Sequence, residues 1–234
     1  MNTIPNFTEY TIHDTRYTIL NTVYYFSMAW VIVGLGNPGI QYEGTRHNSG
    51  RMAVEDFAKT FKFSEWKEDK KSKSLVSRGL VVPPPHKASA SQGKTLVALV
   101  LPNTFMNKSG FAVSKFVKTA KSAERLAVVY DDLDLPLGAM KISFNRGSGG
   151  HKGIESIMRA IKTKKFARVR IGVSHSTASG AIRKPEGEKV ILNFILTKFK
   201  AHEFEEFKRV SKKVSHALET IATEGLPRAM NQFN

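Results

Sequence analysis

Clusters of polar residues repeatedly follow short apolar runs in this chain, and this order limits the possible folds more than any other feature. The first apolar run, residues 30–35, is short and continuous, as in a strand that is buried on both faces. Polar clusters follow this run and three later ones, at residues 45–48, 102–107, 131–132 and 149–153. In an open α/β sheet, ligands bind beyond the carboxyl ends of the parallel strands. We therefore expect the four clusters to form one site.

The apolar pattern along the chain alternates between strands and helices. It predicts strands at residues 30–35, 75–82, 95–101, 126–130, 139–144 and 167–173, and helices at 47–61, 111–120, 153–161 and 200–223. Residues 83–93 include three consecutive prolines and are expected to form a loop. This order predicts an α/β fold, a single domain whose mixed, mostly parallel twisted sheet is flanked by helices on both faces.

The ends of the chain lack the pattern of the centre. We expect residues 1–29 to be a flexible N-terminal extension, 30–225 to form the domain, and 226–234 to be a C-terminal tail. Arg16 is the only basic residue before position 30, which is unlike a transit peptide, and Met28 is an alternative start. No apolar stretch is long enough to span a bilayer. Mitochondrion and cytoplasm both remain open as the compartment.

The charge of the chain indicates a polyanionic partner. Its 36 Lys and Arg residues exceed its 20 Asp and Glu residues by 16. A distributed cationic excess binds nucleic acid by displacing counterions. The alternative is a basic surface that serves only solubility, but +16 is far more than a small domain needs. The absence of cysteine excludes disulfides, a thiol nucleophile and a zinc–thiolate site.

The glycines of residues 34–39 match the G-x-G-x-x-G fingerprint of dinucleotide-binding proteins. The surrounding residues disfavour this interpretation. Pro38 and residues 42–45 are typical of a loop where the fingerprint requires a helix. Glu55 and Asp56 fall within a predicted helix, although the acidic residue of the fingerprint should end a second strand. A dinucleotide-dependent oxidoreductase therefore remains only a distant alternative.

His47 is the candidate catalytic base. Adjacent side chains of a strand point to opposite faces, so only one of Asp131 and Asp132 can face the same cleft. A carboxylate that accepts the Nδ1 proton of a histidine leaves Nε2 free to take a proton from water. Since no Ser or Cys stands in a nucleophile elbow, direct attack by water is the simpler chemistry. A metal site with His151 lacks ligand spacing, and we expect no metal.

Neutral and cationic groups in the same clusters are candidates for binding a substrate. Asn37, Asn48 and Asn107 can hold an amide or a developing oxyanion without a charge of their own. Arg146 begins a glycine-rich stretch before His151. Such a stretch can direct backbone amides and a helix N-terminus towards an anion, or it can be a flexible turn. The segment alone leaves both interpretations open.

Taken together, these motifs resemble those of the bacterial-type peptidyl-tRNA hydrolases. The motifs are Gly34-Leu35-Gly36-Asn37-Pro38-Gly39, Tyr42-x-x-Thr45-Arg46-His47-Asn48-x-Gly50, Thr104-Phe105-Met106-Asn107-x-Ser109-Gly110, Asp131-x-Leu133-Asp134-Leu135-Pro136-x-Gly138, Gly149-Gly150-His151-x-Gly153 and Arg170-Ile171-Gly172. They occur in the family's order between about residue 30 and about residue 225. Each motif is weak by itself, but the ordered set is highly specific.

The resemblance implies a monomeric enzyme, without cofactor or metal, that hydrolyses the ester between peptide and tRNA in peptidyl-tRNA and so frees tRNA from abandoned translation products. His47 matches the catalytic base and Asp131 the carboxylate that orients it. The other matches are Asn37, Asn107 and His151, which hold the substrate, and Tyr42, Phe105 and Met106, which form its contact surface.

Two positions depart from the family pattern. Lys152 replaces the asparagine that usually follows the histidine of the Gly-Gly-His motif. Arg170 matches the arginine that binds the tRNA 5′ phosphate, but Ser143 stands where the family has the partner lysine. Lys141 shares a strand face with Ser143, so we expect it to take over. Phosphate contacts are thus expected from Lys141, Arg170, Arg146 and Lys152. The departures leave a catalytically weakened tRNA-binding protein as the main alternative.

Overall fold

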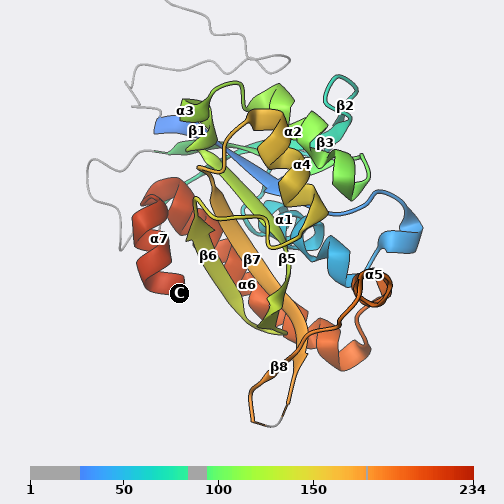
Figure 1. Cartoon of the computed structure of the whole chain (residues 1–234). Coiled ribbons are helices and arrows are strands. Elements are labelled where there is room, and N and C mark those ends of the chain that lie inside the picture. Colours follow the sequence, from blue (N-terminus) through green and yellow to red (C-terminus); the bar gives the residue numbers. More distant parts are fainter. Residues whose placement is uncertain (1–26, 84–93, 178) are drawn as a thin grey trace, which may run out of the picture.

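The computed structural model describes residues 27–83, 94–177 and 179–234, and these form an eight-stranded sheet covered by helices (Figure 1). Seven strands lie in the order β2-β3-β4-β1-β5-β7-β6, and β8 pairs with β7. The strands are β1 (Ser27–Gly34), β2 (Lys67–Asp69), β3 (Ser74–Val81), β4 (Thr95–Pro102), β5 (Leu126–Pro136), β6 (Met140–Phe144), β7 (Ala167–Ser176) and β8 (Ile182–Arg183).

The centre of the sheet is parallel. Strand β1 pairs in parallel with β4 and with β5, and β5 pairs in parallel with β7. The antiparallel pairs lie at the flanks, where β3 joins β4, β2 joins β3, and β6 and β8 join β7. The carboxyl ends of β1, β4 and β5 therefore meet at one edge, as the sequence predicted, and the mixed α/β sheet is confirmed.

Helices cover both faces of this sheet (Figure 1). The helices α1 (Ser49–Thr60), α6 (Ala201–Thr223) and α7 (Leu226–Phe233) share one hydrophobic core, and α2 (Ser109–Phe116) and α4 (Lys152–Ile161) share the other, next to the short α3 (Ala120–Ala123). A further helix, α5 (Glu188–Leu196), contacts the turn before α1. Three short 3₁₀ turns complete the described elements, namely η1 (Ile40–Tyr42), η2 (Arg46–Asn48) and η3 (Met106–Lys108).

The alternation of side chains along β5 explains the two cores. Ala127 and Val129 belong to the core under α1 and α6, whereas Val128 and Tyr130 belong to the core under α2 and α4. All four side chains are buried. A strand that is buried on both faces has apolar residues at every position. This continuous apolar run is the reason why the sequence predicted β5.

The structure differs from the predicted elements at several points. The predicted helix at 111–120 is divided into α2 and α3, and the predicted strand at 126–130 continues to residue 136. The sequence did not predict β2, β8, α5 or α7. Most of the predicted proline loop, residues 84–93, and most of the predicted N-terminal extension, residues 1–26, lie outside the described residues. Strand β1 already begins at Ser27, where it pairs with Thr95.

Residues 226–234 are folded against the sheet rather than separate from it as a tail. They form α7, in which Ala229 is fully buried. The side chain of Asn234 accepts a hydrogen bond from the Ile142 amide at 2.7 Å and donates one to the Ile142 carbonyl at 3.0 Å. The last residue thus extends the hydrogen bonding of β6.

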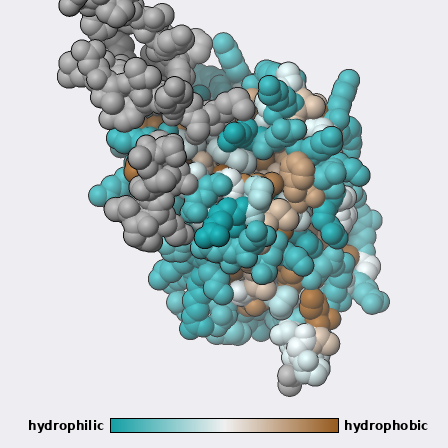
Figure 2. Space-filling model, turned by 90° about the vertical axis from the view of Figure 1, so that its left-hand side faces the viewer, coloured by the Kyte–Doolittle hydropathy of each residue, from teal (hydrophilic) through white to brown (hydrophobic). Residues whose placement is uncertain are grey.

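The surface that carries β6 and α7 is mainly hydrophilic, as Figure 2 shows for the part of the chain that is described. This agrees with the formal net charge of +16. Among the described residues, no helix is both long and apolar enough to cross a membrane.

Candidate active site

The first turn of α1 brings the candidate base to the sheet edge. An added Cβ at Gly50 would lie 2.1 Å from the carbonyl oxygen of Val129, so only glycine permits α1 to begin this close to β5. The preceding turn η2 contains His47, and Asp131 lies midway along β5, two residues beyond Val129, which pairs with Gly34 at the end of β1. Close packing of α1 on β5 therefore places the two side chains together, although 84 residues separate them.

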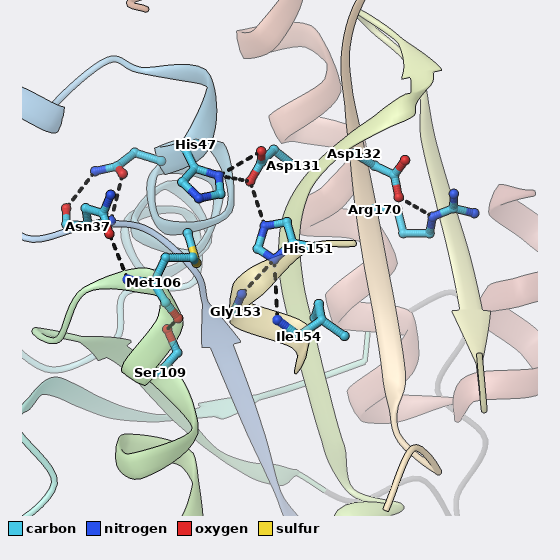
Figure 3. A network of polar contacts seen from close by, with 11 residues as sticks. Asn37, His47, Met106, Ser109, Asp131, Asp132, His151, Gly153, Ile154 and Arg170 are labelled. Carbon is cyan, nitrogen blue, oxygen red and sulfur yellow. Dashed lines mark hydrogen bonds and ion pairs between the residues drawn. The ribbon is translucent and has the colours of Figure 1, made fainter. Parts of the chain in front are cut away.

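His47 and Asp131 form a buried hydrogen-bonded pair (Figure 3). The Nδ1 atom of His47 lies 3.0 Å from Oδ1 and 2.9 Å from Oδ2 of Asp131. The oxygens of an ionised carboxylate only accept hydrogen bonds, so Nδ1 carries the proton and donates it. Nε2 is then the basic nitrogen of the neutral ring, and no described residue bonds to it. This is the tautomer that the proposed base requires.

Asp131 also accepts a hydrogen bond from a second histidine. The Nε2 atom of His151 lies 3.0 Å from Oδ1 of Asp131. His151 is the N-cap of α4, and its Nδ1 accepts hydrogen bonds from the amides of Gly153 and Ile154 at 3.1 and 3.3 Å. Because Nδ1 accepts, it is unprotonated, and His151 is a neutral donor to Asp131. The sequence analysis assigned His151 to the substrate, but the protein itself occupies both ring nitrogens.

Burial and the two histidines have opposite effects on the pKa of Asp131. Burial opposes ionisation, but the charges and hydrogen bonds of His47 and His151 outweigh it and hold the pKa of Asp131 below its ordinary value. Asp131 therefore stays ionised at neutral pH and can stabilise a positive charge on His47.

The next residue, Asp132, faces a different partner. Its Oδ2 accepts a hydrogen bond from Nε of Arg170 at 2.7 Å. The division of roles between Asp131 and Asp132 that the strand alternation predicted is therefore present. Lys141 lies directly opposite Arg170 in the β6–β7 register and is exposed. The two cations predicted to bind a phosphate thus share one face of neighbouring strands.

A network of amides shapes the other side of the base (Figure 3). Oδ1 of Asn48 accepts a hydrogen bond from the Asn37 amide at 2.8 Å, and Nδ2 of Asn48 donates to the Asn37 carbonyl at 3.0 Å. The side chain of Asn48 thus holds the backbone of Asn37, and its predicted contact with the substrate stays a prediction. Oδ1 of Asn37 accepts from the Met106 amide at 2.8 Å. No described residue accepts from Nδ2 of Asn37, which remains available as a donor.

The residues of the predicted contact surface do not all lie at the surface. Phe105 is exposed, and its ring meets the ring of Tyr42 edge to face at a centroid distance of 6.4 Å. Asn107 is exposed on η3 and has no described hydrogen-bond partner. Met106 is a correction, because its side chain is buried in the core under α2 and α4. Its sulfur lies only 2.5 Å from the position that a Cβ on Gly153 would take.

The glycine-rich stretch before α4 is a turn outside any helix or strand. Arg146 is exposed in this turn, and Lys152 is exposed at the first position of α4. The buried Arg168 donates to the carbonyl oxygen of Gly147 and so ties this turn to β7. The amides of Gly153 and Ile154 in the first turn of α4 already bond to His151, so these two are not free for an anion. Ser143, where the family pattern has the partner lysine, is buried opposite Arg168 in the β6–β7 register.

The sequence did not predict the ion pair of Arg46 with Glu203, which holds the turn that contains His47. The neighbouring Arg46 is buried and donates from Nη2 to both carboxylate oxygens of Glu203, each at 2.8 Å. Its Nη1 donates to the carbonyls of Thr197 and Lys198 at 3.1 and 3.2 Å. The pair joins η2 to the start of α6 across 157 residues, so no local pattern in the sequence indicates it.

The close grouping of His47, Asp131 and His151 resembles a metal-ligand set, because one ligand atom of each lies within 4.8 Å of the others. The hydrogen bonds described above account for this spacing. Nδ1 of His47 and Nε2 of His151 both donate to Asp131, so a metal ion at these three atoms would have to displace both protons.

The site thus contains a buried histidine whose Nδ1 is paired with a carboxylate and whose Nε2 is free, at the carboxyl edge of an α/β sheet. This arrangement is typical of an enzyme that activates water. The chain matches the family model for peptidyl-tRNA hydrolase over residues 31–234. It is 39% identical over 207 residues to the peptidyl-tRNA hydrolase of Herpetosiphon aurantiacus, covering 88% of this chain and 90% of the relative. The chain belongs to the peptidyl-tRNA hydrolase family.

Further relatives agree with this assignment. The peptidyl-tRNA hydrolase of Chloroflexus aggregans is 35% identical over 211 residues, covering 88% of this chain and 98% of the relative. The crystal structure of the peptidyl-tRNA hydrolase from Acinetobacter baumannii superposes with a TM-score of 0.73 at 30% identity, covering 90% of this chain and 96% of that chain. The predicted family and enzyme class are confirmed. The chain is a hydrolase that takes part in translation and cleaves peptidyl-tRNA into tRNA and peptide.

Proposed function

We propose that His47 and Asp131 carry out the hydrolysis of peptidyl-tRNA, with His47 as the base and Asp131 as the carboxylate that orients it. The observation that carries this proposal is the hydrogen bond of His47 Nδ1 to Asp131, at 2.9 and 3.0 Å, which leaves Nε2 unprotonated. Nε2 removes a proton from a water molecule, and the water oxygen attacks the ester carbonyl carbon. Asp131 stabilises the imidazolium that forms.

Collapse of the tetrahedral intermediate completes the reaction. The bond between the carbonyl carbon and the ribose oxygen breaks, and the proton held on Nε2 of His47 passes to that oxygen. The products are a peptide with a free carboxyl group and a tRNA with a free hydroxyl group, and His47 returns to its neutral form. Nδ2 of Asn37, which has no described acceptor, is placed to donate to the carbonyl oxygen as its negative charge develops.

The two ends of the substrate contact different groups in this proposal. Tyr42, Phe105 and Asn107 line the side of Asn37 and contact the peptide end. Lys141 and Arg170 bind a phosphate of the tRNA, with Arg146 and Lys152 as exposed cations nearby. His151 acts through Asp131 rather than on the substrate. We further propose that the enzyme acts as a monomer without a metal, and that residues 27–234 form its catalytic domain.

The experiment that tests this proposal compares three enzymes on one N-blocked aminoacyl-tRNA. We expect His47→Ala to lower kcat by about 10²-fold or more, the range of a lost general base, while tRNA binding is retained. Asp131→Asn should lower kcat less, because the base remains but loses the charge that stabilises its protonated form. The acid limb of the rate–pH profile should then shift to lower pH in Asp131→Asn.

A matched substrate provides the control. The same tRNA with a free amino group should be cut far more slowly, because its ammonium group meets a cationic surface. An active His47→Ala enzyme, or a pH profile that is the same in wild type and Asp131→Asn, would show that another group activates the water.

A further inference from the structure

A second concave region lies on the α2–α4 side of the sheet, outside the site described above. It is a cavity of about 350 Å³ between the start of α2 and the middle of α4. Its lining consists of Lys73, Thr104, Lys108, Phe111, Ser156, Arg159 and Ala160. Three of these residues are cations and none is acidic. An added Cβ at Gly110 would lie 2.1 Å from the Ser156 carbonyl oxygen, so close contact of α2 with α4 forms the floor of the cavity.

One cation of this cavity lies near an exposed aromatic ring in its lining. The ammonium group of Lys73 lies 5.7 Å from the ring centroid of Phe111, and Lys115, outside the lining, lies 4.6 Å from the same centroid. The Phe111 side chain is 42% exposed although it stands among cations. No described carboxylate pairs with Lys73 or Arg159, so their charges remain available to a ligand. An anion next to a flat aromatic surface is the chemistry that such a cavity fits.

The hydroxyl group of Thr104 is a second indication of an anionic ligand. Its Oγ1 is buried and has no hydrogen-bond partner among the described residues. A buried hydroxyl without a partner loses its hydrogen bonds to water without replacement, so such a group needs an explanation. The hydroxyl of Ser156, by contrast, already accepts from the Gly110 amide at 3.0 Å. Thr104 is therefore the lining residue whose buried hydroxyl has no partner among the described residues, and we include this hydroxyl in the test below.

The cavity is connected to the active site through a short piece of chain. Thr104 is followed by the exposed Phe105 and then by Met106, whose amide bonds to Asn37 beside the base. The chain segment that lines the cavity at Thr104 therefore continues directly to the backbone that holds Asn37. The cavity lies beside β4, whereas Lys141 and Arg170 lie on β6 and β7, beyond β1 and β5 in the sheet. It is therefore separate from the phosphate contacts proposed above.

We propose that this cavity binds a phosphate group of the single-stranded 3′ end of the tRNA, with a neighbouring base against Phe111. This deepens the proposed function and rests on it. The alternative ligand is an acidic side chain of the peptide. The RNA is favoured because it is the constant part of the substrate, whereas the peptide varies from one substrate to the next. The three cations Lys73, Lys108 and Arg159 are present for every substrate, and so is the 3′ end of the tRNA.

The test uses the full chain and measures kcat and KM against salt concentration. Lys73→Gln/Arg159→Gln removes two cations of the cavity, and Lys212→Gln/Lys213→Gln removes two exposed cations from α6 on the other face. The substrates are two N-acetyl-aminoacyl-tRNAs, one with alanine and one with aspartate. We expect the cavity variant alone to raise KM by about fivefold, with kcat retained. The slope of log(1/KM) against log salt should fall by about 0.7 for each lost cation.

The outcomes separate the possible ligands. An equal rise in KM for both substrates supports the RNA phosphate. A rise for the aspartate substrate alone would overturn the proposal in favour of a peptide carboxylate, and a result equal to the control would remove the site altogether. Failure of the wild-type enzyme to cut either substrate would instead count against the proposed function.

Thr104→Val gives an independent readout, because it removes the hydroxyl at nearly constant shape. If the hydroxyl serves a ligand, KM should rise while the thermal midpoint of the free protein stays the same or increases. A lowered midpoint with unchanged KM would show that Thr104 is only structural.

Discussion

At the scale of single residues, the site depends on which proton each histidine holds. Asp131 lies between His47 and His151 and accepts a hydrogen bond from each. The Gly153 and Ile154 amides at the start of α4 donate to Nδ1 of His151 and so keep its proton on Nε2. That proton is donated to Oδ1 of Asp131, which restricts the orientation of the carboxylate. One carboxylate can therefore hold His47 in place and stay ionised, since two donors compensate its burial.

We predict that His151 affects the rate of the reaction rather than substrate binding. His151→Ala should lower kcat by about tenfold or more, the effect of losing a hydrogen bond to a charged group, with little change in KM. His151→Asn should restore the thermal midpoint, because Asn is a good N-cap, but not kcat, because its shorter side chain does not also reach Asp131. A rise in KM at constant kcat in both variants would return His151 to the substrate-binding role that the sequence suggested.

At the scale of secondary-structure elements, the turn that contains His47 is held by two distant elements. Gly50 allows α1 to approach β5, and the buried ion pair of Arg46 with Glu203 ties η2 to α6. Burial opposes the ionisation of Glu203, but the Lys200 amide and the Arg46 charge outweigh it and lower its pKa. This ion pair is consequently a condition for the geometry of the base.

We predict that Glu203→Gln lowers the free energy of unfolding by about 3 kcal/mol, because it leaves the charge of Arg46 buried without a counterion. Glu205→Gln is the matched control on the same helix. It removes an exposed ion pair with Lys208, so the thermal midpoint should stay nearly unchanged. Equal effects of the two variants in thermal unfolding would contradict this role of Glu203.

The pH dependence of this stability has a defined sign. Because folding lowers the pKa of Glu203, its contribution is complete above about pH 4.3, the ordinary value for glutamate, and is lost as the pH falls below that value. The stability difference between wild type and Glu203→Gln should therefore shrink in acid.

At the scale of the whole molecule, the net charge of +16 concerns the polyanionic substrate rather than the fold. The proposed phosphate cations Lys141 and Arg170 lie on the β6–β7 side of His47, and the cavity around Phe111 lies on the β4 side. An RNA strand that reaches both would cross the catalytic edge of the sheet. This arrangement makes salt dependence the natural measurement for the molecule as a whole.

We predict that Lys141→Ala raises KM and lowers the salt slope by about one unit, as expected for one lost phosphate contact. Lys212→Ala, which removes an exposed cation from α6, should change neither. Cleavage of a minimal ester substrate that lacks the tRNA body should persist at the wild-type rate in Lys141→Ala. A proportional loss on the minimal substrate would place Lys141 in the chemistry or the fold.

The sequence by itself determined the central strands, the alternation of helices with them and the family. Apolar runs such as those of β1 and β5 are local signals, because a strand buried on both faces needs apolar residues at every position. The same alternation predicted that Asp131 and Asp132 face different partners, as they do. The motifs also singled out His47 as the candidate base, and that role stays a prediction.

Only the tertiary structure decided which polar atoms remain free. Asn48, Met106 and His151 stand in motifs of the site, yet partners within the protein occupy the amide of Asn48 and the ring of His151, and the core buries Met106. Hydrogen-bond partners of this kind come from elements far apart in the sequence. The same reason applies to the pairing of Arg46 with Glu203, since burial and geometry, which the order of residues does not contain, determine such contacts.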